Sequence, residues 1–135
     1  MKKRMLALAM ILILVLTSTV FAYAEVEPRD TNIVWFSIDR TSRTSAASTV
    51  DVTFSTYVDR YNVTIYLQKK VDNRWVSDVR NADYVYSNSG TNALDFTFNH
   101  IYTSLESSTI YRLKCVSTDY VGTNQYTTTT YSNQF

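Results

Sequence analysis

The sequence predicts an all-β protein, a β-sandwich of about seven short antiparallel strands that follows an N-terminal export signal. Three observations predict this fold. Apolar and polar residues alternate with a period of two along several segments, as in strands with one buried face. Turn residues separate these segments about every ten positions. Beyond residue 24 no segment has the 3.6-residue period of a helix, while β-branched residues and Tyr are abundant.

Residues 1–24 have the three parts of a secretory signal peptide. Lys2-Lys3-Arg4 forms the positive start, an apolar run extends from Met5 to Leu16, and Ala22-Tyr23-Ala24 places small residues before a cleavage site. The apolar run is shorter than the roughly 20 residues that span a bilayer, which disfavours the alternative of an uncleaved anchor. We therefore expect a helical signal peptide and a secreted mature domain over residues 25–135, free or associated with the cell wall and without a membrane partner.

The first half of the mature domain contains three alternating segments. Residues 33–38 form the first, and a polar loop over residues 40–48 follows it. Residues 50–55 and 61–68 repeat the pattern, with Val, Ile, Leu and Phe at every second position. A turn at Asp72-Asn73 ends this half, because Asp and Asn favour tight turns.

The second half contains two weaker strand segments and three clear ones. The weaker pair flanks Arg80-Asn81, and Gly90 predicts a turn over residues 87–92. A further turn is expected at Leu105–Ser108, and Gly122 marks the last one. The predicted strands of this half are 75–79, 84–86, 94–98, 111–116 and 125–131.

The composition excludes several classes of protein. Cleavage after residue 24 removes three basic residues and no acid, so the formal net charge falls from +1 to −2. A mildly acidic chain without a basic block has no electrostatic footprint for nucleic acid, so no nucleic-acid partner is expected. The single Cys, the single His and the two Gly exclude disulfide-scaffold, zinc-finger and collagen-like proteins, and we expect no cofactor.

The segment from Leu105 to Val116 resembles the corner and penultimate strand of fibronectin type III and other immunoglobulin-like domains. In both, a Leu, a short turn and a Thr precede a Tyr that alternating apolar residues follow. The resemblance implies an immunoglobulin-like β-sandwich over residues 25–135, with structural roles for Leu105 and Tyr111. It also implies that the Tyr111 hydroxyl bonds to backbone upstream.

A second resemblance covers the chain from Val63 to Phe135. This part is similar to a family of small secreted proteins of gram-positive bacteria, which have a signal peptide, one immunoglobulin-like domain and no assigned function. The resemblance therefore implies a secreted bacterial protein and transfers no site. The matching residues are Ile65–Lys70, Trp75, Tyr111–Lys114 and Thr130–Asn133.

Cys115 is an odd thiol in a chain that is expected to be exported. Antibody-type domains pair two cysteines, but here Val52 and Phe54 occupy the region of the partner, so packing alone must hold the core. The spacing of Cys115 from Tyr111 and Leu113 points the thiol inward, where it acts as a small hydrophobe. The alternative is a reactive or intermolecular thiol, and resistance of the folded protein to a polar maleimide would separate the two.

Catalytic and metal-binding patterns are weak. His100 is the only histidine, and one His with one inward Cys does not assemble a zinc site. The acids are scattered, without the spacing of a calcium loop. A Ser–His–Asp arrangement needs only one His, so a small secreted hydrolase stays open as an alternative, although no nucleophile motif supports it.

Aromatic residues outnumber what one small core can hold. Tyr and Trp are amphipathic anchors at interfaces and stack on sugar rings, whereas Tyr is also simply common on sheet surfaces. We expect Tyr66, Trp75, Tyr84 and Tyr86 to be binding aromatics. The aromatics assigned to outward positions are Trp35, Tyr57, Tyr66, Tyr84, Tyr86, Tyr120 and Tyr126.

These observations favour a secreted, non-catalytic binding or interaction module. Its partner would be a protein or a cell-surface glycan, held on a Tyr-rich sheet face or on the loops at one end. The third possibility, beside binding and hydrolysis, is a structural subunit that pairs with another chain through the edge strand Thr127–Tyr131. An outer-membrane barrel is disfavoured, because about 110 residues are too few for eight strands and their turns.

Overall fold

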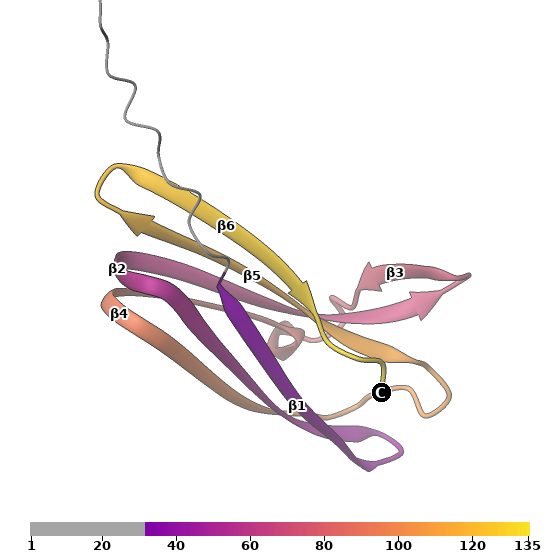
Figure 1. The fold of residues 1–135 in the computed structure, drawn as a ribbon. Helices are drawn as coiled ribbons and strands as arrows, with labels where there is room; N and C mark the ends of the chain where they lie inside the picture. Colours follow the sequence, from indigo (N-terminus) through magenta and orange to yellow (C-terminus); the bar gives the residue numbers. More distant parts are fainter. Residues whose placement is uncertain (1–31) are drawn as a thin grey trace, which may run out of the picture.

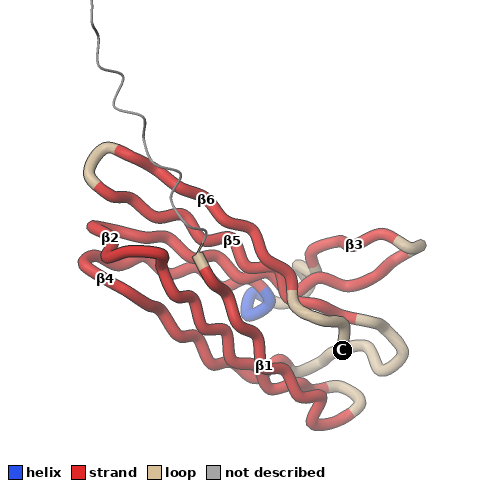
Figure 2. Tube along the Cα trace, in the orientation of Figure 1, coloured by secondary structure: helices blue, strands red, loops and turns tan. Residues whose placement is uncertain are grey.

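The computed structural model describes residues 32–135, which form an all-β structure (Figures 1 and 2). The prediction of an all-β protein is confirmed. The expected signal peptide lies outside the described residues. No helix within the described range is long and apolar enough to cross a membrane. The elements are β1 (Ile33–Ser42), β2 (Ser45–Val71), β3 (Arg74–Ser77), the 3₁₀ turn η1 (Ala82–Tyr84), β4 (Val85–Tyr102), β5 (Tyr111–Val121) and β6 (Asn124–Tyr131).

Six strands replace the larger number of short strands that the sequence predicts. The segments 50–55 and 61–68 join in β2, which has 27 residues, and much of 84–98 joins in β4, which has 18. The two strands pair along both halves of β2, with a register shift between Thr53 and Val58. An irregularity in the pairing, rather than a break in the strands, therefore bends the chain here.

The predicted turn at Gly90 is wrong, because Gly90 lies inside β4 and faces Tyr61 across the strand pair. A Cβ atom at Gly90 would lie 2.5 Å from the Tyr61 ring. The glycine therefore makes room for an aromatic ring, a role that glycine often has in strands.

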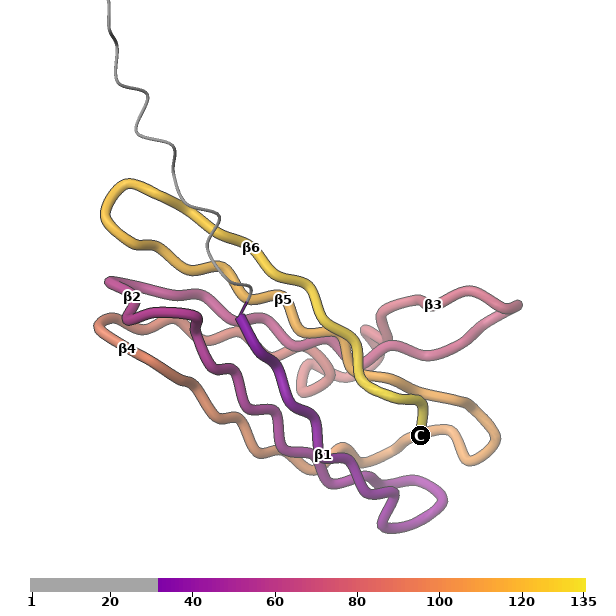
Figure 3. The backbone as a smooth tube through the Cα atoms, viewed as in Figure 1, coloured from indigo at the N-terminus to yellow at the C-terminus, as the bar shows by residue number. Residues whose placement is uncertain are grey.

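All strand pairs are antiparallel, and β2 is the strand that connects the two halves of the sheet. Its first half, residues 45–53, pairs with β1 on one side and with the end of β4 on the other. Its second half, residues 58–71, lies between β5 and the start of β4, and β6 pairs with β5. β2 and β4 double back together at one end, so that the sheet curls (Figure 3).

The hydrophobic core lies inside the curl. Even-numbered side chains are buried over residues 46–54 of β2, whereas odd-numbered side chains are buried over residues 63–67. The irregularity at 53–58 changes this parity, so that both halves of β2 turn one side to the same core. The largest fully buried apolar side chains are Tyr84, Tyr102, Tyr111, Ile65, Leu67 and Leu113.

The β2–β3 hairpin extends beyond the rest of the sheet, at the right of Figure 1. Its turn is Asp72-Asn73, as the sequence predicts, with φ of 49° and 61°. Two successive positive φ angles are the mark of the type I′ turn that suits two-residue hairpins. The hairpin carries Trp75, which faces Lys70 across the strand pair.

A corner precedes β5. The Tyr111 hydroxyl accepts a hydrogen bond from the backbone N–H of Glu106 at 2.9 Å. Leu105 is buried, and its N–H donates to the carbonyl of Thr44 at 3.0 Å. Backbone bonds of 3.0 Å in both directions join Tyr111 to Phe135, so the chain after β6 is fixed against the start of β5.

An ionic cluster lies beside this corner. The buried carboxylate of Asp78 accepts hydrogen bonds from Arg80, one of them 2.6 Å long, and the hydrogen bonds lower the pKa of Asp78. Glu106 lies 2.9 Å from Arg80 and 3.2 Å from Lys69, and hydrogen bonds from Thr109 and Lys69 lower its pKa. The cluster ties the η1 segment and β2 to the corner.

Candidate functional site

The outer surface of the second half of the sheet carries the densest group of binding-type side chains. The strand register places them on one side, because residues that face each other across paired strands project to the same face. We call this surface the cationic–aromatic face. It comprises Arg60, Tyr66, Lys70, Trp75, Arg112, Lys114, Tyr120 and Tyr131.

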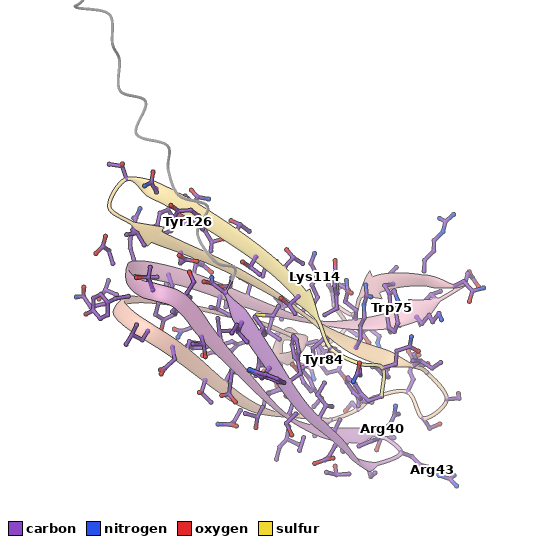
Figure 4. All side chains as sticks on the ribbon, viewed as in Figure 1. Arg40, Arg43, Trp75, Tyr84, Lys114 and Tyr126 are labelled. Atoms are coloured by element: carbon purple, nitrogen blue, oxygen red, sulfur yellow. The ribbon has the colours of Figure 1, made fainter. Side chains whose placement is uncertain are left out.

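Each cation of this face lies over an aromatic ring. The Arg112 guanidinium is 4.3 Å from the centre of the Trp75 ring and 4.1 Å from that of Tyr131. Arg60 lies 4.0 Å from the centre of the Tyr120 ring. The ammonium groups lie farther out, with Lys114 5.4 Å from Tyr66 and Lys70 5.8 Å from Trp75. Figure 4 labels Lys114 on β5 and Trp75 on the neighbouring hairpin.

Arg112 is the most constrained of these cations. Its Nε donates to the Gln68 side-chain oxygen at 2.9 Å, while its plane packs against two rings. A stacked guanidinium keeps its N–H groups in the plane, where they can bind a carboxylate or phosphate in a bidentate manner. The sheet therefore holds Arg112 as an oriented donor group.

The face contains cations without acids. No Asp or Glu occupies the outward strand positions of β2 from 60 to 70, or those of β3, the first half of β4, β5 and β6. None of Arg60, Lys70, Arg112 and Lys114 forms an ion pair with a carboxylate of residues 32–135. The local charge of the face is therefore positive in a chain whose net charge is near zero.

Apart from Val116, uncharged polar side chains cover the space between the two cationic ends of the face. We call them the hydroxyl band. Thr64 and Ser87 share a hydrogen bond of 3.1 Å, as do Thr118 and Thr127. The band comprises Asn62, Thr64, Ser87, Ser89, Thr118 and Thr127.

The outer surface of the first half of the sheet has the opposite character, and we call it the acidic face. Asp39, Asp51 and Asp95 project from it, and no Lys or Arg does so at the strand positions of β1, the first half of β2 and the end of β4. The Asp51 carboxylate accepts a hydrogen bond of 2.7 Å from Thr97. Trp35, which is 70% exposed, stands beside Asp51.

Two of the four aromatics expected to bind lie on the cationic–aromatic face, and two do not. Tyr66 and Trp75 are on the face and half-buried. Tyr84 is only 1% exposed, and its hydroxyl donates to the Thr103 carbonyl, so its assignment to an outward position is wrong. Tyr86 packs against the core and stacks on Phe98, with ring centres 4.0 Å apart. Figure 4 labels Tyr84 within the curl.

The other expected outward aromatics are distributed over several surfaces. Trp35 and Tyr57 are exposed, and Tyr57 lies where β2 bends. Tyr120 belongs to the cationic–aromatic face, whereas Tyr126 pairs with the buried Asp119 and so projects to the inner side of β6. The excess of aromatic residues therefore does not form a single patch.

The three residues given structural roles lie in the interior. Tyr111, Leu105 and Cys115 are buried members of the core. Burial raises the pKa of the Cys115 thiol to about 12, which keeps it protonated at neutral pH. A protonated, enclosed thiol is a poor nucleophile.

His100 lines a pocket together with Ser37, Asp39 and Ser48. Its ring stacks on Phe98 and meets Tyr102 edge-on, and its Nε2 has no hydrogen-bond partner among residues 32–135. The Ser48 hydroxyl donates to the His100 carbonyl at 3.3 Å. No group of three or more His, Cys, Asp or Glu that could hold a metal ion occurs in the described part of the chain.

The sequence interpretation missed the cations and Tyr131. Arg112 and Lys114 alternate with the buried Leu113 and Cys115, so their outward direction was readable from the pattern. What the pattern lacks is the register that brings Trp75 to one side of Arg112 and Tyr131 to the other. Comparison with protein families, with curated proteins and with solved structures found no match to this chain.

Proposed function

We propose that this protein is a secreted, non-catalytic binding module with an immunoglobulin-like β-sandwich, and that it holds a polyanionic partner on the cationic–aromatic face. The observation that carries the proposal is the set of four cations that lie on aromatic rings and have no carboxylate partner among residues 32–135. Like charges held close together are unfavourable in the free protein, so an anionic ligand gains from relieving them.

The strand arrangement supports the immunoglobulin-like part of the proposal. β1, the first half of β2 and the end of β4 form one three-stranded group, and the start of β4, the second half of β2, β5 and β6 form another. Sandwiches of this class divide their strands into a three-stranded and a four-stranded group. The Tyr111 hydroxyl, which accepts from the backbone five residues upstream, supports the same classification.

The expected export signal restricts the partner. A domain outside the cell meets glycans and surface proteins, and acidic members of both classes carry carboxylate or phosphate groups. We therefore propose an extracellular polyanion and keep nucleic acid outside the proposal. Trp75 and Tyr66 contribute by holding Arg112 and Lys114 in place, in addition to any contact with the ligand.

Retention on a sulfonate cation-exchange resin at pH 7.5 tests this proposal. A chain of near-zero net charge has no reason to bind such a resin unless one face concentrates its cations. We expect the protein to be retained and the double variant Arg112→Gln/Lys114→Gln to elute in the flow-through or at much lower salt. The matched control is Arg43→Gln/Arg74→Gln, which removes two exposed cations away from the face and should elute close to wild type. Equal elution of the two double variants would contradict the proposal.

Assembly through an edge strand is the second candidate function, and β6 is the observation that favours it. Among the described strands, β6 pairs only with β5, so its second edge along Asn124–Tyr131 faces no other described strand. Size-exclusion chromatography over a hundredfold range of concentration tests this candidate. A constant monomeric elution volume would exclude it.

A further inference from the structure

We infer that the polyanion is a linear acidic glycan, which lies along β5 across the cationic–aromatic face. This inference rests on the proposed function and adds the chemical class of the ligand. Three features of the face lead to it: the separation of its cations, the hydroxyl band between them, and the way in which the rings are used.

The cations lie at two separate ends of the face. Arg112 and Lys114 are at the start of β5, with Lys70 beside them, whereas Arg60 lies over Tyr120 near the end of β5. Six residues separate Lys114 from Tyr120, which corresponds to about 20 Å at the rise of an antiparallel strand. A single phosphate or carboxylate cannot reach both ends, so the ligand that uses the whole face is a polymer.

The hydroxyl band decides between classes of polymer. Nucleic acid carries a phosphate about every 3.4 Å along each strand, and a polyphosphate chain is charged at every unit. Either of them would place several charges over the uncharged band. A glycan with acid groups on only some of its sugars places hydroxyl groups there, and Thr and Ser can both donate to and accept from them.

The aromatic rings are occupied by the protein's own cations. Arg112 lies against both Trp75 and Tyr131, and Arg60 lies close to Tyr120. The rings therefore fix the cations in position, so that less conformational entropy is lost when an anion binds. Recognition through acid groups and hydroxyls fits this arrangement better than stacking of neutral sugars on bare rings.

Two double variants separate the roles of charge and hydroxyl. Thr118→Val/Thr127→Val removes the bonded hydroxyl pair of the band while it keeps side-chain shape and strand propensity. Arg112→Gln/Lys114→Gln removes two cations. Each variant, with wild type, is titrated with hyaluronate as a glycan that bears carboxylates on alternate sugars, neutral dextran, polyphosphate and duplex DNA, after thermal unfolding has verified that all three proteins are folded.

We expect wild type to bind hyaluronate more tightly than dextran, polyphosphate or DNA. The Thr pair should weaken hyaluronate binding about fivefold, as the loss of one or two hydrogen bonds does, and leave polyphosphate binding within about twofold of wild type. Arg112→Gln/Lys114→Gln should weaken the binding of both hyaluronate and polyphosphate. Hyaluronate binding no tighter than that of dextran, or no weaker in the Thr variant, would overturn the glycan inference while the polyanion proposal stands. Tighter binding of DNA or polyphosphate than of hyaluronate would also overturn the glycan inference alone. If Arg112→Gln/Lys114→Gln changed the affinity for no polyanion, the proposed function itself would be overturned.

Discussion

The two outer faces of the curled sheet are built on the same strands, β2 and β4, and yet have opposite charge. The acidic face projects Asp39, Asp51 and Asp95, and the cationic–aromatic face projects four cations over rings. Both faces contribute to the near-zero net charge of the chain, in which 13 basic residues stand against 12 acidic ones. Charge that is balanced in the composition can therefore be strongly separated in space, and a net charge near zero does not by itself exclude an anionic partner.

Reversal of charge on the cationic–aromatic face should have the largest effect on the affinity for a polyanion. We expect Arg112→Glu/Lys114→Glu to weaken polyphosphate binding about 100-fold, because it removes two charge-assisted contacts and adds two repulsive charges. Neutralisation of the other face by Asp51→Asn/Asp95→Asn is the matched control and should leave the affinity unchanged or raise it slightly. Titration calorimetry measures both. A similar loss in both variants would show that overall charge, rather than the face, determines binding.

Loss of the buried Asp78 carboxylate should lower the stability of the whole domain, and it allows a test of whether the two halves of the sheet unfold together. The hydrogen bonds from Arg80 lower the pKa of Asp78 below its ordinary value of 3.8, so the stabilisation is fully present above about pH 4 and is lost as pH falls through the lower folded value. We expect Asp78→Asn to lose about 2 kcal/mol of unfolding free energy at pH 7 and to show less further loss on acidification than wild type. Urea titrations between pH 2.5 and 7 measure both effects.

The two tryptophans report on the two faces separately during such an unfolding. Trp35 stands on the acidic face and Trp75 on the cationic–aromatic face, so the variants Trp35→Phe and Trp75→Phe each retain one fluorescent reporter. If β2 couples the halves, both reporters should change at the same urea concentration in the Asp78→Asn background. Midpoints that differ clearly would show two independently unfolding halves.

Removal of the Tyr111 hydroxyl should have an intermediate effect, which falls on the unfolding free energy. Tyr111→Phe leaves the Glu106 N–H without its acceptor, and we expect a loss of about 1–1.5 kcal/mol in unfolding free energy with unchanged polyanion binding. Chemical denaturation and resin retention are the two measurements. A change in retention would mean that the corner also positions the cationic–aromatic face.

The smallest effect should come from Trp75. Trp75→Ala removes one of the two rings against Arg112, and we expect polyphosphate affinity to fall about two- to fivefold, the value of an exposed cation–π contact. Trp35→Ala is the counterpart on the acidic face and should have no effect. Equal losses in the two variants would contradict the distinction between the faces.

Much of the fold could be predicted from the alternation of apolar and polar residues. The errors of that prediction have physical causes. A period of two identifies strands, but it cannot tell a turn from a bend within a continuous strand, so the pattern predicts two strands, 50–55 and 61–68, where β2 is one. Tyr84 and Tyr86 both project toward the core, and the short segment around Val85 gave no sign of which side that is. Gly90 predicts a turn in the sequence, whereas in the structure it makes room for the Tyr61 ring.

The candidate site was harder to predict, because it depends on register. The chemistry of Trp75 and Tyr66 predicts a binding role from the sequence, while alternation marks Arg112 and Lys114 only as outward residues of one strand. Their conversion into a site needs the pairing that places Trp75 and Tyr131 on either side of Arg112. Contacts between residues 37 positions apart in sequence are set by the whole sheet and leave no local signal.

The length of β2 also has a kinetic consequence. Its second half has no neighbour on the far side until β5 is synthesised, some forty residues later, and its first half must wait for the end of β4. A chain that depends on such distant pairings folds slowly, in milliseconds to seconds. We propose that this protein crosses a membrane unfolded. Slow folding would then keep the chain unfolded, and so competent for export, until translocation is complete.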